Sequence, residues 1–157
     1  MSSLTSKLPD IKGKYEFNIP LSQSTWFRVG GAADVIFKPA DIDDLCHFIK
    51  HKSPELEYYT LGAGSNVLVS DNGLNKCVIR LSRSFAEIKQ QDNLIILGSA
   101  CLDRTAALTA CQLGLSGLEF LVGIPGAIGG AIAMNAGAYG YETKDNLQWI
   151  EWITPSG

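Results

Sequence analysis

Two glycine-rich runs contain the residue types in this sequence that are best suited to binding chemistry. The first, LGAGSNVL, places Gly-Ala-Gly directly before Ser-Asn. Apolar residues flank the run, so we expect a tight turn between strands at 58–61 and 66–70. Consecutive backbone N–H groups in such a turn form a concave anion site, and the two polar side chains add donors. The turn predicts a phosphate or pyrophosphate site. The alternative is a plain hairpin connection without a ligand. The residues of the turn are Gly62, Ala63, Gly64, Ser65 and Asn66.

This turn matches neither of two common nucleotide-binding fingerprints. A dinucleotide fold of the G-x-G-x-x-G type would need a third glycine at position 67 and a helix beginning there. Val67 occupies that position, and the following VLVSDNG has the composition of a strand and a turn. A P-loop would need Gly-Lys-Ser/Thr after the turn, which the sequence lacks. Within the turn, we expect Gly64 to adopt a positive φ or to approach a phosphate closely.

The second run, GIPGAIGGAIAMNAGAYG, spans residues 123–140 and contains six glycines. Glu119 is the only acidic or basic residue between positions 105 and 141. Glycine contributes almost no apolar surface, so its use is close backbone approach or a positive φ. We expect a bare surface for a flat, bulky group, with Asn135 and Tyr139 orienting that group by hydrogen bonds. A buried helix packed closely on a sheet is the alternative, which accounts for the Gly-Gly pair but not for the other glycines.

Together, a phosphate-like site and a ring-like surface predict a dinucleotide cofactor lying between two subdomains. The sequence has no Ser/His/Asp arrangement, no metal-ligand spacing and no carboxylate pair in apolar surroundings. His47 and His51 are four residues apart, but they fall on the polar face of a predicted helix without an evident third ligand. We therefore predict no metal site, and any chemistry would depend on the cofactor.

Composition excludes several other classes of protein. The 157 residues carry a net charge of −3 with scattered Lys and Arg, so no nucleic-acid surface is predicted. The apolar stretch 120–134 is shorter than the roughly twenty residues of a membrane span and is interrupted by glycine and proline. The N-terminal residues lack the apolar region of a signal peptide. Four cysteines without paired spacing indicate reduced thiols, as in a cytoplasmic protein.

The order of the predicted elements indicates an α+β chain with two subdomains. We expect residues 1–20 to be a solvated arm, 21–81 the first subdomain and 82–157 the second. Asp41 is a predicted N-cap and Gly114 a predicted residue just past a helix end. The chain finishes at a Pro-Ser-Gly turn without a return strand, so we expect the second subdomain to be incomplete. Helices are predicted at 42–52 and 103–113, and further strands at 24–29, 33–37, 77–81, 94–97 and 148–154.

Four segments of the chain resemble the UDP-N-acetylenolpyruvoylglucosamine reductase (MurB) family, flavoenzymes of peptidoglycan synthesis. They are TWFRVGGAADV, LGAGSNVLVSDNG, GLSGLEFLVGIPGAIGGAIAMNAGAYG and WITPSG, which follow the family's order and cover most of residues 18–157. The resemblance implies an FAD-binding fold of the para-cresol methylhydroxylase (PCMH)/vanillyl-alcohol oxidase type, in which two α+β subdomains enclose non-covalent FAD. It implies that residues 62–66 hold the pyrophosphate. The residues that it implies along the FAD are Pro125, Gly126, Ala127, Gly130, Asn135, Ala136, Gly137 and Tyr139.

The same resemblance implies the reaction and its partners. NADPH would reduce FAD, and a hydride would then pass to UDP-N-acetylglucosamine enolpyruvate, giving UDP-N-acetylmuramate. The family's arginine in a Tyr-Arg motif, its serine proton donor and its late glutamate have no counterpart here, since Tyr139 is followed by Gly140. We expect the catalytic residues and the substrate-binding domain to lie beyond residue 157, and this chain alone to be inactive. Two alternatives are another PCMH-type oxidoreductase, with flavin attached through a histidine, and a non-catalytic flavin- or nucleotide-binding module.

Overall fold

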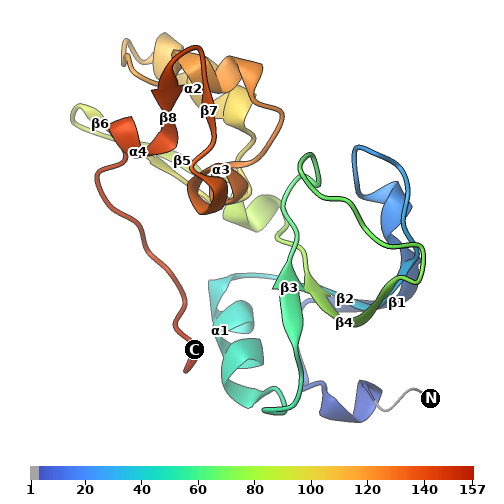
Figure 1. Cartoon of the computed structure of the whole chain (residues 1–157). Helices are drawn as coiled ribbons and strands as arrows, with labels where there is room; N and C mark the ends of the chain where they lie inside the picture. Colours follow the sequence, from blue (N-terminus) through green and yellow to red (C-terminus); the bar gives the residue numbers. More distant parts are fainter. Residues whose placement is uncertain (1–3) are drawn as a thin grey trace. The chain divides into compact units, whose positions relative to one another are not determined.

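The computed structural model describes residues 4–157, which fall into two compact units (Figure 1). Unit 1 comprises the chain up to Ser82 together with Trp152–Gly157, and unit 2 is Arg83–Glu151. Both units combine helices with strands, which confirms the predicted α+β class. None of the helices in the described residues is long and apolar enough to cross a membrane.

Unit 1 is built on a four-stranded sheet with the order β1-β2-β4-β3. Strand β1 runs antiparallel to β2, whereas β4 lies parallel to both β2 and β3. The carboxyl ends of the three parallel strands consequently share one edge, which is a frequent position for ligand sites in such sheets. The strands are β1 (Lys14–Pro20), β2 (Ala32–Lys38), β3 (Tyr58–Thr60) and β4 (Leu74–Ile79).

Helix α1 (Ile42–His51) begins at a side-chain cap and packs on one face of this sheet (Figure 1). Asp41 accepts a hydrogen bond of 2.8 Å from the amide of Asp44, which confirms the predicted N-cap. The ring of Phe48 stacks on that of Phe37 in β2, with 4.4 Å between the ring centroids. Both rings are fully buried, so this contact anchors the helix to the sheet.

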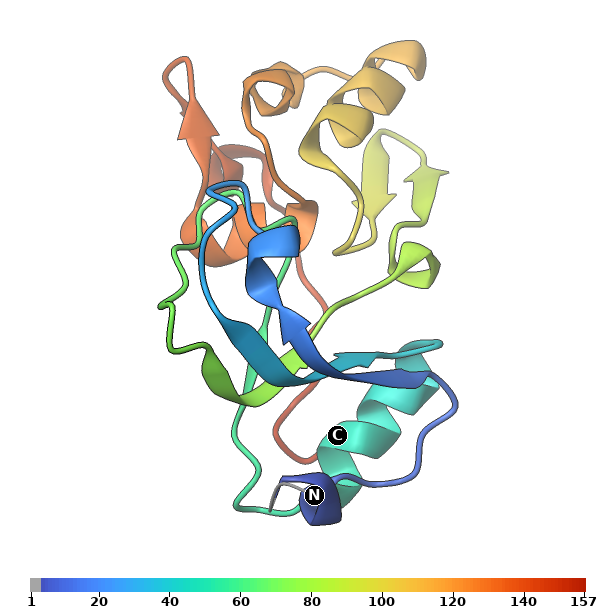
Figure 2. The same cartoon turned by 90° about the vertical axis from the view of Figure 1, so that its right-hand side faces the viewer.

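Two long loops, 21–31 and 61–73, cover the opposite face of the sheet (Figure 2). The first loop begins with the short 3-10 helix η2 (Leu21–Gln23). The amide of Trp26 donates to the carbonyl of Gly64 over 2.9 Å, so each loop supports the other. Beneath them lies a small apolar cluster made of Leu21, Ala33, Ile36 and Val78, with Ile19, Leu61, Val69 and Leu74 packed against it.

Asp44 is a buried carboxylate that ties the N-terminal segment to α1. It is 1% exposed, and its oxygens accept hydrogen bonds from the amides of Lys12, Gly13 and Ala40. Burial by itself would raise the pKa of Asp44, but these three donors outweigh it and hold the pKa below its ordinary value. The pattern of polar residues in this helix gives no sign of that role, because exposed and buried aspartates look alike in sequence.

Residues 14–20, which composition assigns to a solvated arm, form strand β1 instead. The ring of Tyr15 lies 5.5 Å from that of Phe37, so this strand contributes to the core. The 3-10 helix η1 (Thr5–Lys7) precedes it. Residues 1–3 of the predicted arm lie outside the described residues. The assignment was wrong because polar residues alternate with apolar ones in KYEFNIP, and alternation outweighs polarity in an edge strand.

The strands predicted at 24–29, 66–70 and 148–154 are wrong, since these segments are irregular. An extended segment becomes a strand only where a neighbour takes up its backbone hydrogen bonds. In the first two segments the apolar residues belong to loops that lie over the sheet rather than within it. Trp152–Gly157 groups with unit 1, whereas the sequence assigns it to the second subdomain.

Unit 2 is built from short elements around helix α2 (Asp103–Gln112). A hairpin of β5 (Ile88–Gln91) and β6 (Leu94–Leu97) precedes the helix; β6 was predicted, whereas the more polar β5 was not. The remaining elements are η3 (Arg83–Phe85), η4 (Glu119–Gly123), α3 (Ile128–Met134), β7 (Gly137–Ala138), β8 (Tyr141–Glu142) and α4 (Thr143–Asn146). The core of the unit contains Cys101, Ala106, Ala107, Phe120, Leu121 and Ile128.

Helix α2 ends in a Schellman motif. Gly114 has a φ of +73°, and its amide donates to the carbonyl of Cys111 over 3.0 Å. The amide of Leu115 donates to the carbonyl of Ala110 over 2.9 Å, which completes the motif. The structure thus confirms the predicted helix and the role of Gly114 at its end.

Candidate functional site

The loop that follows β3 has the backbone donors expected of an anion site. Residues 62–66 form bends and a turn just past the carboxyl end of β3. Their amide N–H groups donate to no protein group within the part of the chain that the structure describes. The turn is held in place because the carbonyl of Gly64 accepts from the amide of Trp26. A supported turn with a run of unpaired amides has the donors that an anion nest needs, and its role in holding an anion stays a prediction.

Gly62 and Gly64 lack side chains for different reasons. Gly64 has a φ of +70°, and a Cβ there would collide with the carbonyl oxygen of Ser24. Gly62 is exposed, and a Cβ there would meet nothing within 4 Å. Gly64 is therefore required by the packing of the two loops, whereas Gly62 leaves an open surface beside the unpaired amides.

Large apolar side chains of the same two loops are exposed. Trp26, Phe27 and Leu68 are 63%, 62% and 75% exposed. Apolar surface gathered on neighbouring loops is typical of a place that a ligand or a protein covers. The loops thus combine polar backbone donors with apolar surface, as a nucleotide site requires.

In unit 2, the loop before α3 is held against the segment before α2. The amide of Asp103 donates to the carbonyl of Gly126 over 3.1 Å, and the amide of Ile128 to the carbonyl of Cys101 over 2.9 Å. A Cβ at Gly126 would collide with Oδ2 of Asp103. Gly126 is consequently required by this close approach, and its loop has little freedom to move.

Asp103 is a buried carboxyl without a partner. The residue is 0% exposed, and neither of its carboxyl oxygens has a hydrogen-bond partner among the described residues. Burial raises the pKa of Asp103 to about 6, since an unpaired charge is costly in an apolar interior. Its neutral form is therefore favoured well above the ordinary range of a carboxylic acid.

The chain after α3 turns sharply through residues in left-handed conformations. Asn135 ends α3 with a φ of +45°, and Tyr139 and Gly140 have φ values of +56° and +84°, as in a type I′ hairpin turn. Tyr139 is 81% exposed, and its ring lies over Gly123, where a Cβ would be 2.9 Å from Oη. Gly130 is also open, because a Cβ there would meet nothing within 4 Å.

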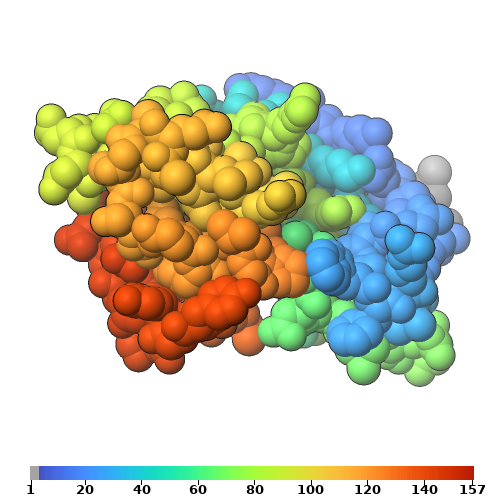
Figure 3. Space-filling view, turned by 90° about the horizontal axis from the view of Figure 1, so that it is seen from above, coloured from blue at the N-terminus to red at the C-terminus, as the bar shows by residue number. Residues whose placement is uncertain are grey.

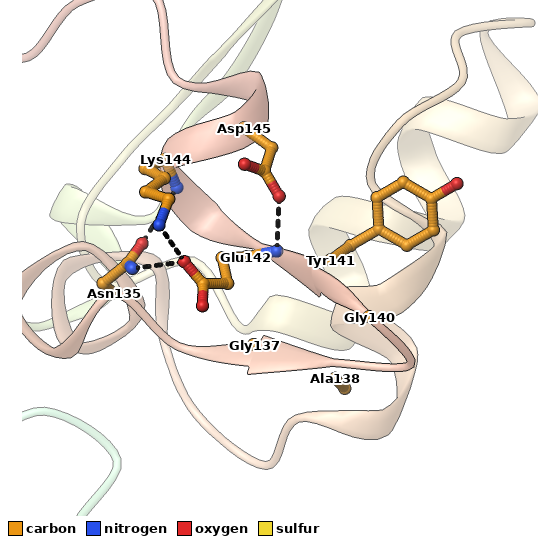
Figure 4. Close-up of a pocket in the computed structure, with 8 residues that line it drawn as sticks. All are labelled: Asn135, Gly137, Ala138, Gly140, Tyr141, Glu142, Lys144 and Asp145. Atoms are coloured by element: carbon orange, nitrogen blue, oxygen red, sulfur yellow. Dashed lines mark hydrogen bonds and ion pairs between the residues drawn. The ribbon is translucent and has the colours of Figure 1, made fainter.

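A hollow of about 620 Å³ beside the hairpin includes Asn135 and Gly137 of the predicted set (Figure 4). Nδ2 of Asn135 donates to Oε2 of Glu142 over 2.9 Å, and its Oδ1 accepts from the amide of Lys144 over 3.0 Å. Figure 4 shows these three side chains gathered together, with Tyr141 pointing away from them. Both ends of the Asn135 amide are engaged within the unit, so its role in orienting a ring stays a prediction.

The predicted site residues fall into two groups, one in each unit. In unit 2, Ala127 is buried, and Gly126 and Ala136 are half-buried. The exposed residues of this group are Pro125, Gly130, Asn135, Gly137 and Tyr139. In Figure 3 the residues near 120 (orange) and near 140 (red-orange) form one continuous surface of unit 2.

Other reactive residues of the chain lie apart from these loops or are poorly placed to react. No group of His, Cys, Asp and Glu within residues 4–157 is arranged to hold a metal ion. His47 and His51 stack with 4.1 Å between ring centroids on the exposed side of α1. Burial raises the pKa of the Cys77 thiol to about 12, so this cysteine stays protonated.

The fold and these loops are those of a flavin-binding protein. Residues 33–157 match the model of the protein family described as "FAD binding domain", and the chain belongs to this family. The unpaired amides of 62–66 fit the acceptor oxygens of a diphosphate, and the open faces at Gly62 and Gly130 leave room for a cofactor. The residues present therefore fit FAD.

Proteins with similar sequences and structures indicate which kind of FAD-binding protein the chain resembles. The chain is 49% identical, over all of its 157 residues, to the UDP-N-acetylenolpyruvoylglucosamine reductase of Acidiphilium cryptum (strain JF-5), of which it covers 51%. It is 50% identical over 92% of its length to the protein of the same name from Bradyrhizobium sp. (strain ORS 278), of which it covers 47%. The crystal structure of UDP-N-acetylenolpyruvylglucosamine reductase (MurB) from Thermus caldophilus matches 85% of the chain with a TM-score of 0.67 and 33% identity; the match covers 46% of that protein. The chain spans about half the length of the curated relatives it matches.

Sequence reasoning missed two charged residues beside the candidate loops. Asp103 looked like an ordinary residue of a first helical turn, and nothing in the pattern showed that it would be buried. In sequence, Arg80 resembles any isolated surface cation. It lies two positions after Val78, however, and residues two apart in an extended chain point to the same face of the sheet. That spacing was the available signal, because Val78 faces the loops.

Asp103→Asn should remove a pH dependence of stability. The folded-state pKa of about 6 lies above the value of roughly 3.9 expected for the unfolded chain, so the folded protein binds the proton more tightly. Stability from this group is therefore complete below pH 4 and is lost as the pH rises through 6, by at most about 3 kcal/mol. The measurement is urea unfolding of wild type and variant at pH 4 and pH 7.5. The free energy of unfolding of the variant, relative to wild type, should rise by up to that amount from pH 4 to pH 7.5. The exposed control Asp92→Asn should show no such rise. A difference that stays constant with pH would contradict the assignment.

Proposed function

We propose that this chain is the FAD-binding portion of an NADPH-dependent reductase. The enzyme would convert UDP-N-acetylglucosamine enolpyruvate to UDP-N-acetylmuramate for peptidoglycan synthesis. The observation that carries the proposal is the 49% identity over the whole chain with a reductase of that name. The nest of unpaired amides at 62–66 supports it independently, because it fits the diphosphate of the cofactor.

The two units would have different tasks in binding. In unit 1 the amides of 62–66 would hold the diphosphate, and Ser65 and Asn66 would add side-chain donors. In unit 2 the exposed residues Pro125, Gly130 and Tyr139 would line the flavin, with the Tyr139 hydroxyl available as a hydrogen-bond partner. Bound FAD would supply hydride transfer from NADPH to the enolpyruvyl double bond. The part of this chain would be to bind and orient the cofactor.

The proposed activity also suggests where the protein works. NADPH and nucleotide sugars are cytoplasmic compounds, and we propose the bacterial cytoplasm as the location. The four free cysteines among the described residues support a reducing compartment.

A covalent flavoprotein of the same superfamily is the second candidate that sequence suggests. Such an enzyme would need a histidine at the flavin. The only two histidines of the chain are on α1, which packs on the face of the sheet opposite to loop 61–73. This arrangement favours non-covalent FAD.

The purified chain should contain FAD that acid releases. Acid unfolds the protein and breaks its hydrogen bonds to the cofactor, but it leaves a covalent flavin attached. The measurement is the visible spectrum of supernatant and pellet after precipitation with trichloroacetic acid, with chromatography to identify the flavin. Flavin that stays in the pellet would support the covalent alternative. A chain that neither purifies with FAD nor binds added FAD would contradict the proposed function.

Gly62→Val and Gly64→Ala should affect different properties: the first the affinity for FAD, the second the stability of the apo protein. At Gly62 the added side chain has room, so the apo protein should keep its thermal midpoint while FAD affinity falls at least about tenfold through obstruction of the site. At Gly64 the left-handed φ and the collision with Ser24 should destabilise the apo protein by about 2 kcal/mol or more. The measurements are FAD titration by fluorescence quenching and thermal unfolding of the apo forms. A Gly62→Val chain that binds FAD as tightly as wild type would show that this face is not part of the site.

The 157-residue chain loaded with FAD should not turn over the enolpyruvyl substrate. The sequence contains neither the proton donor nor the arginine that the resemblance implies, and general acid catalysis alone contributes roughly 10²–10⁴-fold. The assay is NADPH consumption without oxygen, with and without UDP-N-acetylglucosamine enolpyruvate. The full-length reductase of Acidiphilium cryptum is the positive control. Substrate-dependent consumption by the chain at a comparable rate would show that its own residues catalyse the reaction.

A further inference from the structure

We propose that Arg80 supplies the positive charge of the diphosphate site, next to the amide donors of 62–66. This inference rests on the proposed function, because it names a further binding residue for the same cofactor. Arg80 lies outside both glycine-rich runs of the sequence, and its position in unit 1 is what points to a role.

Arg80 directly follows β4 and points toward the loop face of the sheet. Its amide donates to the carbonyl of Phe37 over 2.9 Å, which fixes the backbone at the carboxyl ends of β2 and β4. Side chains two positions apart in an extended chain share a face, and Val78 belongs to the apolar cluster under the loops. Nη1 of Arg80 donates to Oγ of Ser24 in loop 21–31 over 2.6 Å, so its side chain does reach that face.

Ser24 in turn adjoins the glycine turn. Its carbonyl oxygen occupies the place where a Cβ of Gly64 would be, and a Cβ there would lie 3.1 Å from the Cα of Thr25. Two residues on, the amide of Trp26 donates to the carbonyl of Gly64. The guanidinium is thus bonded to a residue that packs directly on the turn whose amides are unpaired.

The charge of Arg80 has no counterion among the described residues. Within residues 4–157, the ion pairs that involve carboxylates of unit 1 are all formed with lysines. Arg80 is half-buried, and its one side-chain hydrogen bond to protein in this part of the chain uses a single donor of the five that a guanidinium carries. A half-buried arginine with spare donors, in contact with a residue that packs on the turn of unpaired amides, is suited to a multiply charged oxyanion.

The alternative is that Arg80 serves only to hold Ser24 and thereby the two loops. The two roles differ in what the variants should do. Ser24→Ala removes the hydrogen bond between the residues but leaves the charge of Arg80 in place. Arg80→Lys keeps a charge without the planar fork, and Arg80→Met removes the charge while retaining much of the apolar stem. Arg83→Met is the control, since Arg83 is exposed and lies three positions away.

The experiment is titration of the apo chain and each variant with FAD and with ADP at 0.15 M salt. FAD binding is followed by fluorescence quenching and ADP binding by calorimetry, with thermal unfolding of each apo form. We expect Arg80→Met to weaken both ligands by about 10- to 100-fold, Arg80→Lys to lose less, and Ser24→Ala and Arg83→Met to stay within about threefold of wild type. The apo midpoints of Arg80→Met and Ser24→Ala should be similar.

Three results would overturn the inference. One is an Arg80→Met chain that binds FAD within twofold of wild type. Another is a Ser24→Ala chain that loses as much affinity as Arg80→Met, because the arginine would then act only through the loop. A third is a wild-type chain that binds neither FAD nor ADP, which would overturn the proposed function as well. Tight FAD binding by wild type and by Arg80→Met alike would leave the proposed function intact and refute only the role of Arg80.

Discussion

The two loops of unit 1 depend on a contact that leaves no room for a side chain. The backbone of Ser24 lies directly against Gly64, and the Gly64 carbonyl accepts the amide of Trp26. Because both partners are backbone, the contact fixes the path of the turn more firmly than two side chains would. The contact joins the segment that carries the exposed side chains of Trp26 and Phe27 to the turn that carries the unpaired amides. The carbonyl of Gly64 shares its peptide plane with the amide of Ser65, so the hydrogen bond from Trp26 also restrains the direction of that donor.

Unit 2 uses close approach in a different way. Gly126 packs on a carboxyl group, and Gly123 lies under the ring of Tyr139. In both places a glycine accepts the side chain of a residue that is distant in sequence, so the bare surface predicted for this run is partly occupied by the protein itself. Gly130 remains open. The glycines of this run are therefore not equivalent: some are required for folding, and others leave surface free for a ligand.

Local rules in the sequence predicted the parts of the fold that local physics determines. The N-cap at Asp41, the Schellman glycine at Gly114 and the positive φ of Gly64 follow from the chemistry of single turns, and the structure has all three. The strands predicted at 24–29 and 66–70 failed because apolar residues are needed both inside a sheet and in a loop that lies over it. Apolar residues occur in both cases, and a pairing partner for the backbone is what distinguishes the strand from the loop. Likewise the burial of Asp44 and Asp103 depends on segments far away in the chain, which no local pattern reveals.

A diphosphate site built on main-chain amides, as proposed for unit 1, would keep its donors while its side chains change. Every residue type except proline carries the same N–H group, so replacing Ala63, Ser65 or Asn66 by other residues leaves the principal donors in place. Alanine at Ser65 or Asn66 would remove only the added side-chain donors, whereas alanine at Gly64 would disturb the backbone path itself, because a Cβ there collides with Ser24. Over evolutionary time the turn can accumulate substitutions at its side-chain positions while its donors persist, provided that the glycine against Ser24 is kept. The functional requirement of such a turn would be a backbone path, which the sequence reveals only at positions such as Gly64, where a side chain would block it.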